Sequence, residues 1–188
     1  MNKLFDIKPD LPEGFEYYPG FLSIAEQEML LGIIGQYELK PMQFHEYEAK
    51  RKVLGFGRGW SFTNQELVEG TAIPTAFNFI MEKVGRALQL PFSHFAQMLL
   101  TEYPPGAVIN WHRDAAPFHT IAGISLLSDI SFKLRPQEKT LQTRSATKVL
   151  LVEKGSLYCM KGIAKNEWQH ATAPAKCRRI SITFRTLQ

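Results

Sequence analysis

The 188-residue chain carries near its middle the segment Tyr103-Pro104-Pro105-Gly106-Ala107-Val108-Ile109-Asn110-Trp111-His112-Arg113-Asp114. Within it, His112 and Asp114 are two residues apart, and such positions of an extended segment point to the same face. A second histidine from a distant part of the chain would complete two histidines and one carboxylate, the facial arrangement that holds a non-haem Fe(II). A His-x-Asp pair alone is also typical of a solvated loop, so support has to come from the rest of the chain.

The second half of the chain has the pattern of short strands. Beyond residue 90, seven segments are rich in β-formers and are separated by glycine, proline or polar turns. These segments span residues 95–102, 121–127, 130–134, 148–152, 156–160, 167–172 and 178–185. Two helices precede them, at residues 24–36 and about 74–88. We therefore predict an α+β, mainly β fold in which helices back a β-sandwich or barrel.

Both helices have start signals in the sequence. Ser23 is a candidate N-cap, and Glu26 three residues later can close a capping box ahead of an apolar stripe. Pro74 can occupy the first turn of the second helix. Residues 1–22 ahead of them are expected to be extended and to end in a turn.

Composition indicates a globular chain of one domain. Hydrophobic residues make up 45% of the sequence, aromatic residues 12% and charged residues 21%, which excludes a disordered chain. The net charge of +4 permits a polyanionic partner without requiring one. Cys159 and Cys177 form no Cys-x-x-Cys motif, so we expect a reducing, intracellular setting. We recognise no signal peptide and no segment long enough to span a membrane.

The last strand has a clean alternation. Ile180, Ile182 and Phe184 face one way in an extended segment. The opposite face carries Arg179, Ser181, Thr183 and Arg185. Two arginines about 20 Å apart, at roughly 3.3 Å per residue, can both reach toward the middle of the strand, and guanidinium forks bind carboxylates bidentately. This face suits a small dianion, although it could also be the solvated face of an edge strand.

The chain has five histidines, at positions 45, 94, 112, 119 and 170. Most histidines of β-proteins are hydrogen-bonded structural residues, which is our interpretation of His94 and His119. His119 is close enough to His112 in sequence to remain a rival ligand. His170 is the favoured second histidine because the strand with the paired arginines follows it.

Residues 39–64 interleave aromatic and basic side chains. We expect short strands or a hairpin that turns around Gly55, Gly57 and Gly59, since glycine suits turns. The functional interpretation is a lid that contacts a phosphate backbone through its bases and a nucleobase through its rings. The alternative is a solvated, charged hairpin over a core of aromatic residues.

The pattern Tyr103-x-x-Gly106-x-x-Ile109-x-x-His112-x-Asp114, followed by His170, Arg179 and Arg185, resembles the Fe(II)/2-oxoglutarate dioxygenases of the AlkB family. The tracts 111–115 and 179–185 are especially close to that family. Matching motifs run from about residue 98 to residue 185. The resemblance implies a single domain over residues 1–188, with a nucleotide-recognition lid at about 37–70 and a double-stranded β-helix (jelly roll) at about 92–187.

The resemblance also implies a role for each matching position. His112, Asp114 and His170 would be the catalytic iron ligands. The implied 2-oxoglutarate residues are Thr101, Tyr103, Arg179, Ser181, Thr183 and Arg185, with Arg179 on the distal carboxylate and Arg185 near the iron-chelating end. The implied substrate residues are Lys50, Arg51, Phe56, Trp60 and Trp111.

The sequence departs from the family pattern in three places. Thr101 and Ser181 stand where the family often has asparagine, which reduces the polar cage around the cosubstrate. Residues 115–117, Ala-Ala-Pro, stand where repair members commonly place a carboxylate near the flipped base. The first two changes leave the chemistry credible, and the third leaves the identity of the base open.

The implied activity is oxidative dealkylation of N-alkylated bases in DNA or RNA, with Fe(II), 2-oxoglutarate and O2. An alkyl carbon on a base nitrogen is hydroxylated, succinate and CO2 are released, and the hemiaminal collapses to an aldehyde and the repaired base. A base in a duplex would first have to be flipped out. We expect a monomer with alkylated DNA or RNA as partner, cytoplasmic (nuclear in a eukaryote) and not bound to a membrane.

Three alternatives remain open at this point. The same chemistry could act on a protein or a small molecule. The chain could instead be a β-sandwich module that binds an anion through its arginines without turnover, although such a module needs no iron ligands. A zinc hydrolase could use the same ligands but would give no reason for the paired arginines.

Overall fold

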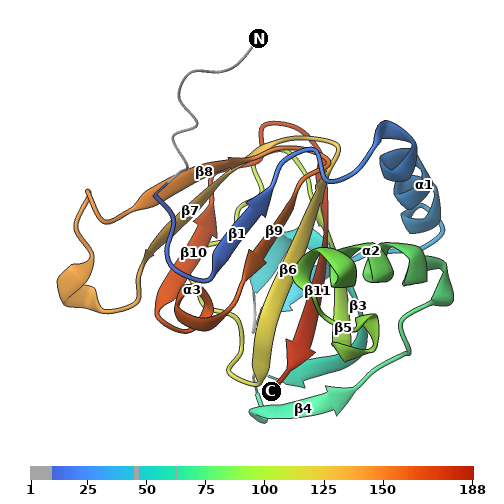
Figure 1. Ribbon diagram of the computed structural model, residues 1–188, viewed down its shortest axis with the longest axis horizontal. Coiled ribbons are helices and arrows are strands. Elements are labelled where there is room, and N and C mark those ends of the chain that lie inside the picture. Colours follow the sequence, from blue (N-terminus) through green and yellow to red (C-terminus); the bar gives the residue numbers. More distant parts are fainter. Residues whose placement is uncertain (1–9, 45–46, 62) are drawn as a thin grey trace.

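The computed structural model describes residues 10–44, 47–61 and 63–188. The larger of its two sheets is antiparallel (Figure 1). Its strand order is β1 (Phe15–Tyr18), β9 (Leu157–Met160), β6 (Phe118–Leu126), β11 (Arg179–Leu187), β5 (Phe95–Tyr103), β3 (Tyr47–Ser61) and β2 (Lys40–Phe44), and β4 (Glu66–Glu69) pairs with β3.

The smaller sheet has three antiparallel strands. Its order is β10 (Trp168–Thr172), β7 (Ile130–Pro136) and β8 (Lys148–Val152). A backbone bridge between His112 and His170 adds the segment around His112 to the free edge of β10. The prediction of a mainly β jelly roll backed by helices is confirmed.

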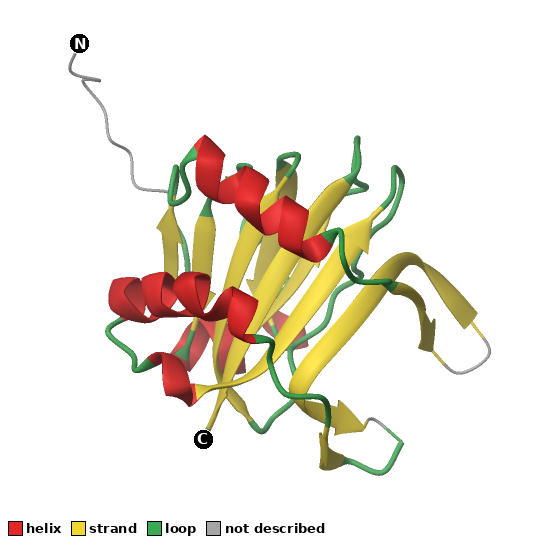
Figure 2. Ribbon diagram, turned by 90° about the vertical axis from the view of Figure 1, so that its right-hand side faces the viewer, coloured by secondary structure: helices red, strands yellow, loops and turns green. Residues whose placement is uncertain are grey.

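Two helices cover one face of the larger sheet (Figure 2). The first, α1 (Ile24–Ile34), starts with the expected capping box: Glu26 N donates to Ser23 Oγ at 3.2 Å, and Ser23 N donates to Glu26 Oε2 at 2.8 Å. The 3-10 turn η1 (Thr75–Phe77) leads directly into α2 (Asn78–Leu88). The shorter elements are η2 (Phe92–His94), η3 (Lys139–Leu141) and α3 (Gly162–Asn166).

The two faces of β11 enter two different cores. Ile180, Ile182 and Phe184 pack into the core under the helices, which we call the helix-side core. A second core, which we call the site-side core, lies between the two sheets and is built from residues that include Tyr103, Phe132 and Tyr158. The alternation of β11 therefore separates the helix-covered face of the larger sheet from the jelly-roll interior.

The expected turn around Gly55, Gly57 and Gly59 is wrong, because all three lie inside the 15-residue strand β3. Gly57 has a φ of +75°, and its N–H donates to Thr71 O at 2.6 Å. A Cβ on Gly57 would overlap the carbonyl of Ala96 on the neighbouring segment. These glycines allow close approach of two backbones and a change of partner, since β3 pairs with β5 up to and including Gly57 and with β4 from Arg58 onward.

Smaller differences from the sequence-based expectation concern element ends. The first helix ends at Ile34 with Gly35 as its C-cap, and part of the extended N-terminal region is the strand β1. The short helix α3 was not expected. His45 lies outside the described residues. Among the helices within the described part of the chain, none is long and apolar enough to cross a membrane.

Candidate metal centre and cosubstrate pocket

His112 and His170 are joined through their main chains. His112 N donates to His170 O at 3.1 Å, and His170 N donates to His112 O at 2.9 Å. Their ring centroids are 4.2 Å apart. Strand pairing therefore sets the spacing of the two imidazoles.

Asp114 is held by an arginine from the last strand. Arg185 donates to Asp114 Oδ1 from Nε at 2.9 Å, and its Nη2 lies 2.7 Å from the same oxygen. Arg185 Nη1 also donates to Gln97 Oε1 at 2.7 Å. The other carboxylate oxygen, Oδ2, lies 3.5 Å from His170 Nε2. Oδ1 is thus occupied by the guanidinium, which leaves Oδ2 as the oxygen that faces His170.

Burial and charge set the protonation states of this pair. Burial alone would raise the pKa of Asp114, but Arg185, aided by the histidines, brings it down to about 2. Burial, with a smaller contribution from His112, lowers the pKa of His170 to about 3. At neutral pH the site therefore has an ionised carboxylate and a neutral imidazole, the forms that bind a metal.

The ring orientations of both histidines are fixed. His112 Nδ1 lies 2.8 Å from Asn110 O. A carbonyl only accepts, so in the neutral ring Nδ1 carries the proton and Nε2 is left to coordinate. The His170 ring stacks on Phe132, with centroids 5.4 Å apart and planes at 12°.

The three side chains fit the donor set of a non-haem Fe(II). One ligand atom from each of His112, Asp114 and His170 can be chosen so that all lie within 4.8 Å of one another. Two imidazoles and one carboxylate suit this ion and leave other coordination positions open. Within the described residues, neither His94 nor His119 belongs to such a group, and both side chains are exposed.

Arg179 lies at the other end of the polar face of β11. It is 2% exposed, and its Nε donates to Ser125 Oγ at 2.9 Å. Its guanidinium carbon lies 4.8 Å from the ring centroid of Tyr103. Thr101, Ser181 and Ser125 are partners in register on three adjacent strands. The predicted cosubstrate residues therefore line one face of the sheet.

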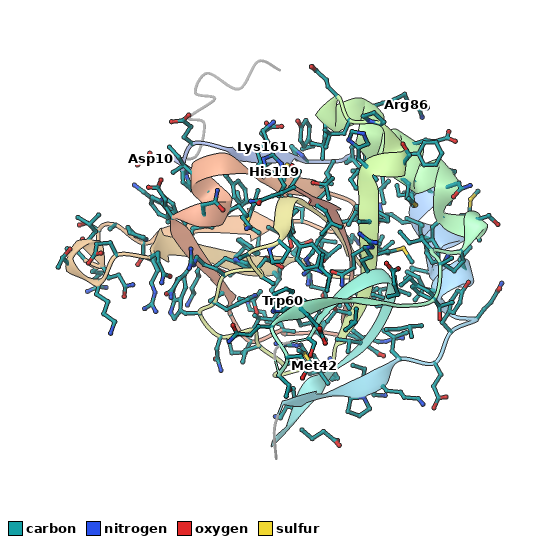
Figure 3. The ribbon with its side chains drawn as sticks, turned by 90° about the horizontal axis from the view of Figure 1, so that it is seen from below. Asp10, Met42, Trp60, Arg86, His119 and Lys161 are labelled. Carbon is teal, nitrogen blue, oxygen red and sulfur yellow. The ribbon has the colours of Figure 1, made fainter. Side chains whose placement is uncertain are left out.

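Strands β2 and β3 bring further predicted residues to the rim of this space. Trp60 of β3 packs partly buried against the site-side core, and Figure 3 shows it with Met42 of β2. Arg51 lies two residues before Val53, the partner of Thr101, so it lies on the site-facing side of β3. The guanidinium of Arg51 contacts Met42 Sδ through Nη2 at 2.9 Å.

Lys50 and Trp111 are also near the metal-ligand segment. Lys50 is exposed, and a Cβ on Gly106 would lie 3.6 Å from its Nζ. The Trp111 ring lies under Arg135, with the guanidinium carbon 4.4 Å from the ring centroid. Arg135 is in turn fixed by Gln169, whose Oε1 accepts from Nε at 2.7 Å.

Phe56 is not brought to this rim. Its partner on β5 is Met98, a residue of the helix-side core, and Phe56 itself is only 6% exposed in that core. Its ring meets Tyr37 edge-on, with centroids 5.5 Å apart. Phe56 therefore packs under the helices, on the opposite face of the sheet from the metal ligands.

Sequence reasoning missed three residues on the site-facing side of the larger sheet: Gln97, Ser125 and Tyr158. Gln97 shares the inward alternation of β5 with Thr101 and Tyr103, and that signal could have found it. The other two lie in strands that are otherwise apolar. Only the pairing of the strands shows that these two side chains face the site.

The sequence profile of the 2OG-Fe(II) oxygenase superfamily matches residues 14–185 of the chain. The chain belongs to this superfamily. Members use Fe(II), 2-oxoglutarate and O2, and membership implies an oxidoreductase with dioxygenase activity. A search of curated protein sequences finds no significant match.

Solved structures share the fold of this oxygenase. OsALKBH1 has a TM-score of 0.74 at 13% identity, over 94% of this chain and 98% of that chain. A prolyl-4-hydroxylase from Pseudomonas putida has a TM-score of 0.57 at 16% identity, over 93% of each chain. A 2OG-Fe(II) oxygenase family oxidoreductase from Burkholderia pseudomallei has a TM-score of 0.65 at 11% identity, over 93% of this chain and 85% of that chain. These likenesses show the fold.

Proposed function

We propose that this oxygenase is an AlkB-like enzyme that oxidatively dealkylates N-alkylated bases in DNA or RNA. The observation that carries the proposal is the lid. Strand β3 leaves the larger sheet at Gly57, pairs with β4 and packs Trp60 against the site-side core. The lid thus offers an aromatic ring beside the site-side core, with basic side chains on the same strand. That combination suits a base with an attached phosphate backbone.

Each side chain has a role in this proposal. His112, Asp114 and His170 hold the iron, which when bound supplies the activation of O2 with 2-oxoglutarate as the electron donor. Arg179 pairs with the distal carboxylate of 2-oxoglutarate, and Arg185 lies at the metal end and orients Asp114. The remaining cosubstrate residues are Thr101, Tyr103, Ser181 and Thr183.

In this proposal, four residues at the rim of the site contact the nucleic acid. Trp60 and Trp111 contact the extruded base, and Lys50 and Arg51 contact the phosphates beside it. Arg58 contributes less, because it is paired with Glu69 at 2.6 Å. Phe56 has no part in it. A whole-chain likeness in fold to OsALKBH1 supports this substrate class.

The overall reaction balances without a further reductant. One atom of O2 enters succinate as 2-oxoglutarate loses CO2, and the other becomes the hydroxyl on the alkyl carbon. The resulting hemiaminal breaks its carbon–nitrogen bond, and the hydroxyl proton passes to the base nitrogen. The products are an aldehyde and the unmodified base.

The test is substrate-dependent succinate formation. Protein purified anaerobically and loaded with Fe(II) is given 2-oxoglutarate in air, with methylated or unmethylated oligonucleotides of DNA and RNA. We expect succinate and formaldehyde to rise with one methylated oligonucleotide, and its methyl group to be lost. A matched reaction with Asp114→Ala should give neither product.

Two other results would contradict the proposal. Succinate that rises with proline-containing peptides, or with no added substrate, would keep the oxygenase and direct the search to proteins or small molecules. A lack of succinate under every condition, with iron measured in the protein, would favour an anion-binding module without turnover.

A further inference from the structure

The two faces of the smaller sheet differ in character. Along β7, Phe132 and Leu134 are buried in the site-side core, so the alternating Lys133 and Arg135 point to the outside. The smaller sheet lies at the end of the molecule away from α1 and α2 (Figure 1). We call its outward side the outer face, which is built from Lys133, Arg135, Val149, Leu151 and Gln169.

Positive charge is concentrated in this sheet. Residues 130–152, which form β7, the β7–β8 connection and β8, carry five basic side chains and one acidic one. Their net charge of +4 equals that of the whole chain, so the remaining residues hold as many acidic as basic side chains. Lys148 is used within the fold, in an ion pair with Asp10. A charge distribution this uneven favours a polyanionic partner on the outer face and the connection beside it.

The two cations of the outer face have donors to spare. Arg135 is held in place, since its Nε donates to Gln169 Oε1 at 2.7 Å and its guanidinium carbon lies 4.4 Å from the ring centroid of Trp111. Within residues 10–44, 47–61 and 63–188, no hydrogen bond or ion pair uses the Nη groups of Arg135 or the ammonium of Lys133. Two cations whose backbone positions are roughly 7 Å apart therefore face outward without a protein anion.

The β8 half of the outer face is apolar and exposed. Val149 is 59% exposed and Leu151 is 55% exposed. They alternate with Leu150 and Val152, which are buried in the site-side core. Val149 is the register partner of Lys133, so the apolar strip runs directly beside the cations.

A cationic strand beside an apolar strand distinguishes between forms of nucleic acid. The outside of a duplex presents phosphates and sugars, which gain nothing from an exposed valine and leucine. A single strand presents phosphates along one side and unstacked bases along the other, and the faces of those bases make apolar contacts. The outer face therefore suits a single strand better than a duplex.

Trp111 connects the outer face to the site. It immediately precedes the metal ligand His112, and Arg135 lies over its ring. A strand whose target base enters the site past Trp111 would meet Arg135 next and Lys133 after it. This continuity with the proposed base site favours the nucleic-acid substrate itself over an unrelated acidic partner.

We propose that the outer face binds the single-stranded nucleic acid that flanks the alkylated base. Lys133 and Arg135 contact its phosphates. Val149 and Leu151 contact the faces of its bases. This inference rests on the proposed function and specifies it, because it selects a single strand over a duplex. The outer face adds affinity for long substrates and takes no part in the chemistry.

The test compares strands of different length. Protein loaded with Mn(II) and 2-oxoglutarate, without O2, is titrated against a fluorescent single strand of about 16 nucleotides and against a trinucleotide, each with the same methylated base. Lys133→Gln should raise the Kd of the long strand about 3- to 10-fold. The slope of log K against log salt should become smaller by about 0.7, the value for one phosphate contact. The Kd of the trinucleotide should stay unchanged, because it is too short to reach Lys133.

Two further variants separate charge from apolar contact. Arg86→Gln is the matched control, because it removes one exposed positive charge from α2, on the helix-covered side of the molecule (Figure 3). Its Kd for both strands should equal that of the unchanged protein. Leu151→Ser should raise the Kd of the long strand about fourfold, the scale of one buried methylene group, with an unchanged salt slope.

Equal Kd values for Lys133→Gln and Arg86→Gln would overturn the proposal, as would a duplex that binds as tightly as the single strand. Competition by polyglutamate as strong as by an unlabelled strand of equal charge would overturn it in favour of an acidic protein segment. Dealkylation with no effect of Lys133→Gln would refute the outer face and leave the proposed function. Binding of single strands that depends on Lys133, without dealkylation, would refute that function and leave the outer face. A lack of binding to every strand would overturn both.

Discussion

Both faces of β11 are buried, but the side chains on one face are apolar and those on the other are polar. On the helix side, Ile182 and Phe184 are 0% exposed, and on the site side Arg179 and Ser181 are 2% and 3% exposed. Burial of apolar side chains stabilises the fold by about 25 cal/mol per Å². Burial of polar ones costs free energy unless every group is paired.

Within this strand, the helix-side residues stabilise the fold, whereas the site-side residues keep polar groups available for binding. The helix-side residues complete their contacts within the chain. On the site side, Arg185 is satisfied by Asp114 and Gln97, whereas Arg179 and Tyr158 keep donors that no described residue uses. Substitutions at alternate positions of β11 should therefore affect either the free energy of unfolding or the binding of cosubstrate.

Removal of a metal ligand should have the largest effect on the site side. Asp114→Ala deletes the carboxylate that faces both histidines, so iron content and succinate formation should fall by at least about 100-fold, since even outer partners of metal ligands cost 10–100-fold. Metal analysis and succinate assays measure this. His119→Ala is the control, because His119 is exposed and outside the ligand group. Full turnover in Asp114→Ala would rule out this metal centre.

On the helix side, Phe184→Ala should cost about 3–5 kcal/mol in the free energy of unfolding, since it leaves a cavity in a closed core. Urea unfolding measures the loss, and the Kd for 2-oxoglutarate should stay unchanged in the folded fraction. Val149→Ala on β8, where the side chain is 59% exposed, should cost less than about 0.5 kcal/mol. A weaker affinity for cosubstrate in folded Phe184→Ala would show that helix-side residues also influence cosubstrate binding.

Arg179→Lys tests the site side without removing charge. A lysine cannot provide the guanidinium fork, so the Kd for 2-oxoglutarate should rise about 10- to 100-fold, the scale of charged hydrogen bonds. Arg178→Lys is a neighbouring control, because Arg178 is exposed and pairs with Glu102 at 2.6 Å on the outside. Equal affinities for the two variants would remove Arg179 from the pocket.

The smallest expected effect is a pH dependence of the metal-free protein. The pKa of His170 is about 3 in the folded chain, and about 6.5 is usual in an unfolded one. His170 therefore binds a proton in the unfolded chain at pH values where it stays neutral in the folded chain. The free energy of unfolding then falls as the pH drops below about 6.5. Between pH 7 and pH 5 the loss should be about 2 kcal/mol.

Urea unfolding of the apoprotein at the two pH values measures this dependence. The charged or titratable groups around His170 are His112, Asp114 and Arg185. Because the pKa of Asp114 is about 2 and its unperturbed value is 3.8, it contributes only below this range. His170→Asn should reduce the slope, and an unchanged slope in that variant would assign the proton to another group.

Local patterns in the sequence predicted the features that depend on neighbouring residues. The i, i+2 spacing of His112 and Asp114, the alternation of β11 and the capping box at Ser23 each need only a few consecutive residues, and the structure has the last two as expected. The two histidines and Asp114 do converge as a possible metal site. His170 was assigned through the resemblance of the whole motif set, because its distance in sequence gives no geometric signal.

Features that depend on strand pairing could not be predicted. Gly57 is a turn residue by local preference, yet it sits inside β3 because Ala96 and Thr71 approach it from other parts of the chain. Phe56 was expected at the lid surface, and register with Met98 turns it into the helix-side core. Tyr158 lies in an apolar run, so only its register with Gly123 turns it into the site-side core.

The main-chain bridge between His112 and His170 should let the proposed iron site lose and regain its metal without unfolding of the protein. Backbone hydrogen bonds set the spacing of His112 and His170, and a hydrogen bond from Arg185 holds Asp114. A chelator should therefore remove the metal without unfolding the protein, and added Fe(II) should restore activity within the time of mixing. Co²⁺ and Ni²⁺ bind such donor sets more tightly than Fe²⁺ does. The metal supply of the surroundings, more than the fold, then governs how much of this enzyme works.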